Sequence, residues 1–183
     1  MRVAVNVVIV YASWFATVVA AAAGHGWLAA AASFAAVVVN VGLAQQRAIE
    51  LKLIALAAFT GLIVEAFLMT LGFANYAAPG AVPGVPPAWL IVMWMAFATL
   101  LNVSFAGLKE RLMLAAVLGF FGGALAYYSG AKLGAMQLSE PVSISLSAVG
   151  ALWAIAFPAL LYAARHLDAE RPRSNSQKSG AAE

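Results

Sequence analysis

Six long apolar segments, almost free of charge, constrain this chain more than any other feature of its sequence. They cover residues 3–23, 27–44, 53–73, 89–108, 112–128 and 144–164, and Glu65 is the one charged residue inside them. A helix needs about 20 apolar residues to cross roughly 30 Å of hydrocarbon, and lipid leaves backbone groups no other hydrogen-bonding partner. The sequence therefore predicts an all-α fold, a polytopic integral membrane bundle of six transmembrane helices.

Composition excludes several classes of site. Charged residues make up 9% of the 183 residues, against about 25% in a soluble domain. The chain has no cysteine and two histidines, which excludes disulfides, thiolate metal sites and cysteine nucleophiles. We therefore expect neither a metal nor a cofactor. The net charge of +3 does not indicate nucleic acid as a partner, because the basic residues lie between apolar segments.

The distribution of basic residues predicts the orientation in the membrane. With the N-terminus in the cytoplasm, only Lys132 of the ten lysines and arginines falls on the outer side. Basic residues concentrate in cytoplasmic loops, so both termini are expected to be cytoplasmic. Residues 1–164 then form the transmembrane domain, and the charged and polar residues 165–183 form a disordered cytoplasmic tail. Residues 1–23 have an alternative interpretation as a signal peptide, although the apolar run exceeds the usual 7 to 15 residues.

The most informative single residue is Glu65. A charge inside hydrocarbon is tolerated mainly where it faces a bundle interior or a cavity, so Glu65 is either functional or a hydrogen-bonding link between helices. Lys132 is the natural partner, because it is the basic residue on the outer side; its alternative is to reach lipid phosphates. Trp94 and Tyr128 are expected at a similar depth, where aromatic residues also form interfacial belts.

A second polar group is expected in the cytoplasmic half. Asn6, Asn40, Asn102 and Ser104 fall there, and interhelical hydrogen bonds explain them without a ligand. Asn102 also shares a helix face with Trp94 and Ala98 at spacings of four residues, which predicts a stripe able to line a cavity. The candidate intramembrane site therefore comprises Glu65, Lys132, Trp94, Tyr128 and Asn102.

Motifs between residues 86 and 136 resemble a bacterial inner-membrane family known as domain of unknown function 2878. The resemblance implies a small multi-pass protein of the bacterial inner (plasma) membrane with no established activity, and it favours lipid handling. It also implies an acidic residue in the third span, matched by Glu65, and a basic residue matched by Lys132, whereas Ala124 stands where the family has proline. The matching residues are Pro86-Pro87-Ala88-Trp89-Leu90, Trp94, Phe97-Ala98-Thr99-Leu100-Leu101-Asn102, Ser104, Gly119, Gly122-Gly123, Tyr128 and Gly130-Ala131-Lys132-Leu133-Gly134-Ala135.

Three functions are compatible with these features. The leading hypothesis is the binding or modification of a membrane lipid within the bilayer, near Glu65 and Lys132. The second is a non-catalytic subunit or chaperone that associates with a membrane protein partner through glycine-rich helix faces. The third is a small proton-coupled permease in which Glu65 titrates. Whether the protein is an enzyme stays open, because no catalytic motif is present.

Overall fold

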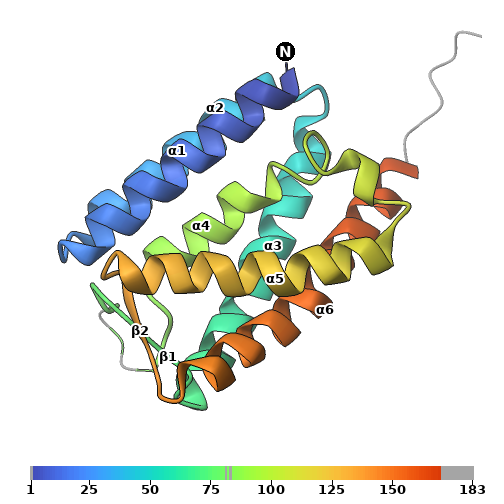
Figure 1. The fold of residues 1–183 in the computed structure, drawn as a ribbon. Coiled ribbons are helices and arrows are strands. Elements are labelled where there is room, and N and C mark those ends of the chain that lie inside the picture. The colour runs from blue at the N-terminus through green and yellow to red at the C-terminus, as the bar shows by residue number, and fades with distance from the viewer. Residues whose placement is uncertain (1, 81, 83, 170–183) are drawn as a thin grey trace, which may run out of the picture.

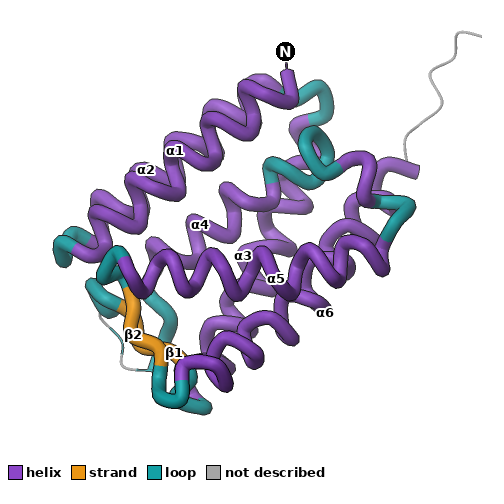
Figure 2. The backbone as a smooth tube through the Cα atoms, viewed as in Figure 1, coloured by secondary structure: helices purple, strands orange, loops and turns teal. Residues whose placement is uncertain are grey.

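The fold is a bundle of six α-helices with one short pair of strands (Figures 1 and 2). The computed structural model describes residues 2–80, 82 and 84–169. Five of the described helices are long and apolar enough to cross a membrane, and the chain is therefore a multi-pass membrane protein. The elements in chain order are α1 (Arg2–Ala22), α2 (Gly26–Leu43), α3 (Arg47–Thr70), β1 (Ala74–Tyr76), α4 (Ala88–Ala98), a 3-10 turn (Ala106–Leu108), α5 (Leu112–Lys132), β2 (Met136–Leu138) and α6 (Val142–Ala169).

Two helical hairpins enclose the remaining helices. α1 packs against α2, and α5 packs against α6, each across a short connection. Between the hairpins, α4 contacts both α2 and α3, and α3 also contacts α6. Figure 1 shows the α1–α2 hairpin on one side of the molecule and α5 and α6 on the other. Residues of α3 and α4 are consequently well placed to meet side chains from several helices.

The fourth predicted span is the one that the structure corrects. Residues 89–108 were expected to form one helix, but α4 covers only Ala88–Ala98 and is too short to cross a membrane alone. From Thr99 onward the backbone forms turns and the 3-10 segment. The Thr99 hydroxyl donates to the Ala96 carbonyl, and Ser104 uses its hydroxyl on another helix. Such polar side chains compete with helical hydrogen bonding, so an apolar run of the right length did not produce a full-length helix.

The molecule has two distinct ends. We call the end that carries the first turns of α1 and α3 and the last turn of α6 the terminal end, and the opposite one the strand end (Figure 1). At the terminal end, Arg2 donates to the Leu43 carbonyl, and Lys109 pairs with Asp168 near the end of α6. α6 continues to Ala169, so residues 165–169 of the predicted tail are helical, and the rest of that tail lies outside the described residues.

At the strand end, α3 and α5 both terminate in the same glycine-containing motif. In α3, Gly72 adopts φ of +72°, and the Phe73 N–H donates to the Leu68 carbonyl; in α5, Gly134 adopts φ of +87°, and the Ala135 N–H donates to the Gly130 carbonyl. Glycine enters this left-handed region without steric cost, which closes the helix in a Schellman motif. A strand begins two residues after each glycine, and β1 and β2 pair antiparallel with Tyr76 opposite Met136. The pairing ties the end of α3 to the end of α5.

Candidate functional site

Glu65 lies at the centre of a fully enclosed hydrogen-bonded cluster. Its side chain is completely buried in α3. Tyr76 of β1 donates its hydroxyl to Oε2, Tyr127 of α5 donates to Oε1, and Trp94 of α4 donates its indole N–H to Oε1 at 2.7 Å. One carboxyl group therefore connects three helices and a strand. Both of its oxygens are occupied, so the cluster as it stands presents no surface to a ligand.

Tyr76 is the member of this cluster contributed by the strand end. Burial, together with the nearby charge of Glu65, raises the pKa of the Tyr76 phenol well above its usual value. The phenol therefore stays protonated and keeps its donor throughout the physiological pH range. The strand pair positions it, since Tyr76 is the last residue of β1 and lies opposite Met136.

Trp94 is held in place by stacking between glycines. Its ring stacks on Trp153 of α6 with a centroid distance of 4.4 Å and an interplanar angle of 19°. A Cβ at Gly61 would lie 2.4 Å from the Trp94 ring, and one at Gly123 would lie 2.4 Å from the Trp153 ring. The pair of indoles thus fits between α3 and α5 only because glycine stands on both sides. Gly61 precedes Glu65 by one helical turn, so both residues lie on the same face of α3. This face leaves space for the Trp94 ring at Gly61 and provides the acceptor for its indole N–H at Glu65.

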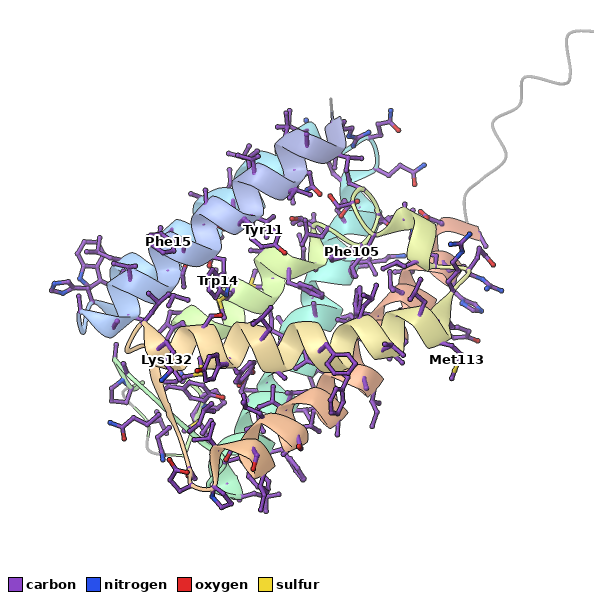
Figure 3. All side chains as sticks on the ribbon, in the orientation of Figure 1. Tyr11, Trp14, Phe15, Phe105, Met113 and Lys132 are labelled. Carbon is purple, nitrogen blue, oxygen red and sulfur yellow. The ribbon has the colours of Figure 1, made fainter. Side chains whose placement is uncertain are left out.

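Of the sequence-predicted residues, the structure brings Glu65 and Trp94 together and leaves Lys132 and Tyr128 outside the cluster. Lys132 lies at the strand end of α5 (Figure 3). Its ammonium is 5.4 Å from the centroid of the Tyr128 ring, a cation–π contact. Tyr128 is 43% exposed, whereas Tyr127 beside it is 4% exposed. The three donors on Glu65 are neutral groups, and none of them is Lys132.

Sequence reasoning missed Tyr76 and Tyr127. The adjacent pair Tyr127-Tyr128 did carry a signal, because neighbouring residues on a helix point about 100° apart and only one of two can face the bundle. Tyr76 carried no comparable signal. It lies in the predicted loop between two spans, and only the pairing of β1 with β2 brings it back over α3.

Asn102 belongs to a second chain of polar contacts at the terminal end. Its amide donates to Glu50 Oε1 at 2.9 Å and accepts from the Lys109 ammonium, which also pairs with Asp168. Four side chains from α3, α6 and the turns between α4 and α5 are thereby linked. Glu50 is 8% exposed, and its other oxygen, Oε2, is buried with no hydrogen-bond partner. Trp94 and Asn102 were expected on one stripe, but α4 ends before Asn102, and the two residues join separate clusters.

A third set of contacts joins α1, α2 and the turns after α4. The Asn6 amide donates to Asn40 Oδ1 at 2.7 Å and to the Thr99 carbonyl at 3.1 Å. The Ser104 hydroxyl donates to Asn6 Oδ1 at 2.6 Å. The interhelical hydrogen bonds expected for Asn6, Asn40 and Ser104 are therefore present.

A cavity of about 260 Å³ opens between these two polar sets at the terminal end. Its walls combine apolar side chains with a guanidinium group, two amides and the Glu50 carboxyl group. The cavity thus places the guanidinium group of Arg2 and the carboxyl group of Glu50 beside apolar surface. The lining residues are Arg2, Val5, Asn6, Asn40, Leu43, Ala44, Glu50, Thr99 and Val103.

The donor chemistry of the described residues does not favour a metal. Within residues 2–80, 82 and 84–169, no three histidine, aspartate or glutamate side chains come together in a way that could hold a metal ion. The polar groups that do converge suit hydrogen bonding to an organic or phosphate ligand.

Comparison with known proteins gives one match. A family model described as "Protein of unknown function (DUF2878)" matches residues 3–159. No curated protein and no solved structure matches the chain. The match covers all the residues of the Glu65 cluster and, apart from Arg2, the residues that line the terminal-end cavity.

Proposed function

Because the chain belongs to the DUF2878 family of proteins of unknown function, its activity has to be argued from its own residues, and we propose that it binds a phospholipid by the headgroup. The proposed site is the cavity at the terminal end. It is enclosed by α1, α2, the start of α3 and the turns that follow α4. The observation that carries the proposal is the lining of this cavity, in which Arg2 and Glu50 stand beside Val5, Leu43 and Val103.

The position of the cavity suits a headgroup. It lies where spanning helices begin and end, which is the depth of the headgroup region in a bilayer. A basic side chain in a pocket between membrane helices on the cytoplasmic side is a typical phosphate-binding feature. The volume of about 260 Å³ is equivalent to roughly nine waters at about 30 Å³ each, enough for a phosphate ester and a short substituent.

The proposal includes an orientation. The described basic residues Arg47, Lys52 and Arg111 lie in or next to the helix starts at the terminal end, as Arg2 does, whereas Lys132 lies at the strand end. The bias of basic residues toward the cytoplasm supports a cytoplasmic terminal end. We place the protein in the bacterial inner membrane with the cavity open to the inner leaflet.

Binding is better supported than modification of the lipid. Among the described residues that line the cavity, Thr99 alone carries a hydroxyl group, and this hydroxyl donates to the Ala96 carbonyl rather than to a general base. A permease based on Glu65 is less well supported, since Glu65 is fully buried, accepts three hydrogen bonds and does not line this cavity. A role as a subunit of a membrane complex stays a prediction.

The proposal is tested by filling the cavity. Val103→Trp places an indole among the lining residues, and Val117→Trp makes the same change on α5, where Val117 is 51% exposed and away from the cavity. Native mass spectrometry of gently delipidated protein should retain phospholipid on the wild type and on Val117→Trp, and lose it on Val103→Trp. Equal retention by the two variants, or none by the wild type, would reject headgroup binding at this site.

A further inference from the structure

One buried oxygen in the cavity lacks a hydrogen-bond donor. Glu50 Oε1 accepts from the Asn102 amide at 2.9 Å, but Glu50 Oε2 has no partner although the residue is more than nine-tenths buried. Leaving a carboxylate oxygen buried without a donor costs free energy, and native structures rarely accept that cost without a reason. Because Glu50 lines the cavity, a molecule that occupies the cavity can supply this donor.

The neighbouring amide and ammonium groups of the protein direct hydrogen bonds to other acceptors. The Asn6 amide donates to Asn40 and to the Thr99 carbonyl, and the Asn40 amide donates to the Ala36 carbonyl. Lys109, the nearest lysine in this polar chain, donates to Asn102 Oδ1 and pairs with Asp168. None of these side chains donates to Glu50 Oε2.

The charges of the lining residues restrict which ligand the cavity can bind. Lys109 is balanced by Asp168, which leaves Arg2 and Glu50 as the cation and the anion that line the cavity. Arg2 donates one N–H group to the Leu43 carbonyl. Its guanidinium has further N–H donors, which suit a phosphate. A zwitterion that carries a phosphate and an ammonium group matches both charges and keeps the site electrically neutral.

We propose that this cavity recognises a phosphoethanolamine group, with the ammonium N–H directed to Glu50 Oε2 and the phosphate directed to Arg2. This inference rests on the proposed function and names the headgroup. A phosphocholine group has the same charges but no N–H, so it leaves Glu50 Oε2 without a donor. A phosphoglycerol group brings a net negative charge and no cation for Glu50.

The wild-type protein tests the proposal through stepwise methylation of the amine. Phosphatidylethanolamine and its monomethyl, dimethyl and trimethyl derivatives, with matched acyl chains, are offered as equimolar mixtures to delipidated protein and read by native mass spectrometry. The first three retain an N–H donor, so we expect them to bind comparably and the trimethyl lipid to bind about tenfold less, as for loss of one charge-assisted hydrogen bond. Equal binding of all four lipids would overturn the proposal while leaving headgroup binding intact.

Two substitutions locate the effect. Glu50→Gln should remove the preference for the N–H-bearing lipids. Glu110→Gln is the matched control, because Glu110 also lies at the terminal end but its side chain is 74% exposed and pairs with Arg165 outside the cavity lining. A preference that survives Glu50→Gln, or that disappears equally in Glu110→Gln, would contradict the assignment to Glu50. If Glu50→Gln does not fold, the methylation series on the wild type still decides.

A soluble competitor distinguishes the source of the group. Free O-phosphoethanolamine should not displace the bound lipid at equal concentration if the cavity is built for a membrane lipid whose chains add apolar contact. Displacement with the same sensitivity to methylation would support the same chemistry and assign it to a free phosphoester. Failure of the wild type to retain any phospholipid, without binding of the soluble ester, would instead reject the proposed function itself.

Discussion

Glu65 shows how a single carboxyl group is accommodated inside an apolar bundle. An isolated charge at this depth costs at least about 2.5 to 3.5 kcal/mol on insertion scales. Three donors from Tyr76, Trp94 and Tyr127 offset this cost, and each hydrogen bond to a charged group contributes on the order of 1.5 to 3 kcal/mol. The cluster therefore holds helices together, and its donors are neutral side chains that need no counterion of their own.

Replacing one donor of this cluster should lower stability. Tyr127→Phe removes a hydroxyl from Glu65 and should destabilise the protein by about 1 to 2 kcal/mol, because bonds between membrane helices fall at the low end of the usual range. Tyr128→Phe is the matched control, since its ring faces Lys132 rather than Glu65. Thermal unfolding in detergent, followed by tryptophan fluorescence, measures both variants. A similar midpoint for the two would show that the bond to Glu65 adds little.

The sequence predicted that Glu65 faces the interior but not which residues meet it. Hydropathy alone identifies a charge that must be shielded, which is why Glu65 could be found. Lys132 was expected as its partner because opposite charges attract, yet partners are selected by helix rotation. Tyr127 faces inward, whereas Lys132, five residues later, lies over Tyr128. The rotation of α5 about its own axis depends on how α5 packs against α6, and the sequence of one segment alone does not determine that packing.

At the scale of the helices, glycines decide how closely α5 and α6 approach. A Cβ at Gly119 would lie 2.5 Å from the Trp153 carbonyl oxygen, a backbone atom that cannot turn away. At Gly122, one turn later, a Cβ would meet nothing within 4 Å. Gly119 and Gly123 are small residues four positions apart, a pattern typical of closely packed membrane helices, and both lie against Trp153 of α6.

Two alanine substitutions on α5 should therefore have opposite effects. Gly119→Ala should push α6 away and lower stability by roughly 1 to 3 kcal/mol, as overpacking does. Gly122→Ala should leave stability unchanged or raise it by up to about 1 kcal/mol, because alanine is the better helix former. Comparison of their unfolding midpoints in one detergent provides the measurement. Equal destabilisation by both would mean that helix propensity in α5, rather than contact with Trp153, controls the outcome.

The helices themselves were largely predictable, because length and apolar content suffice to define a span. The five long helices correspond to five predicted segments, although α3 begins at Arg47 and α6 ends at Ala169, beyond the apolar boundaries. Helices continue past the hydrocarbon wherever polar residues still permit helical bonding. α4 and the strand pair were not predictable from hydropathy, since their limits depend on the side-chain bonds of Thr99 and on pairing between distant segments.

At the scale of the whole molecule, the proposed orientation can be measured directly. The chain lacks cysteine, so single cysteines introduced at exposed Gln45 and Gln137 report on the terminal end and the strand end without background. In intact bacterial cells, a membrane-impermeant maleimide should modify Gln137→Cys but not Gln45→Cys, and permeabilisation should expose the latter. The reverse labelling would place the headgroup cavity in the outer leaflet.

The strand pair has a consequence for biogenesis. During synthesis Glu65 is made first, then Tyr76 and Trp94, and Tyr127 only near the end of the fifth helix. β1 cannot pair until β2 has been made, about sixty residues later in the chain. During translation the carboxyl group therefore enters the membrane ahead of the groups that shelter it. Completion of the cluster coincides with arrival of α5. A nascent chain cut short before that helix carries an unsheltered carboxyl group and an unpaired strand, and such exposed groups favour misfolding and aggregation.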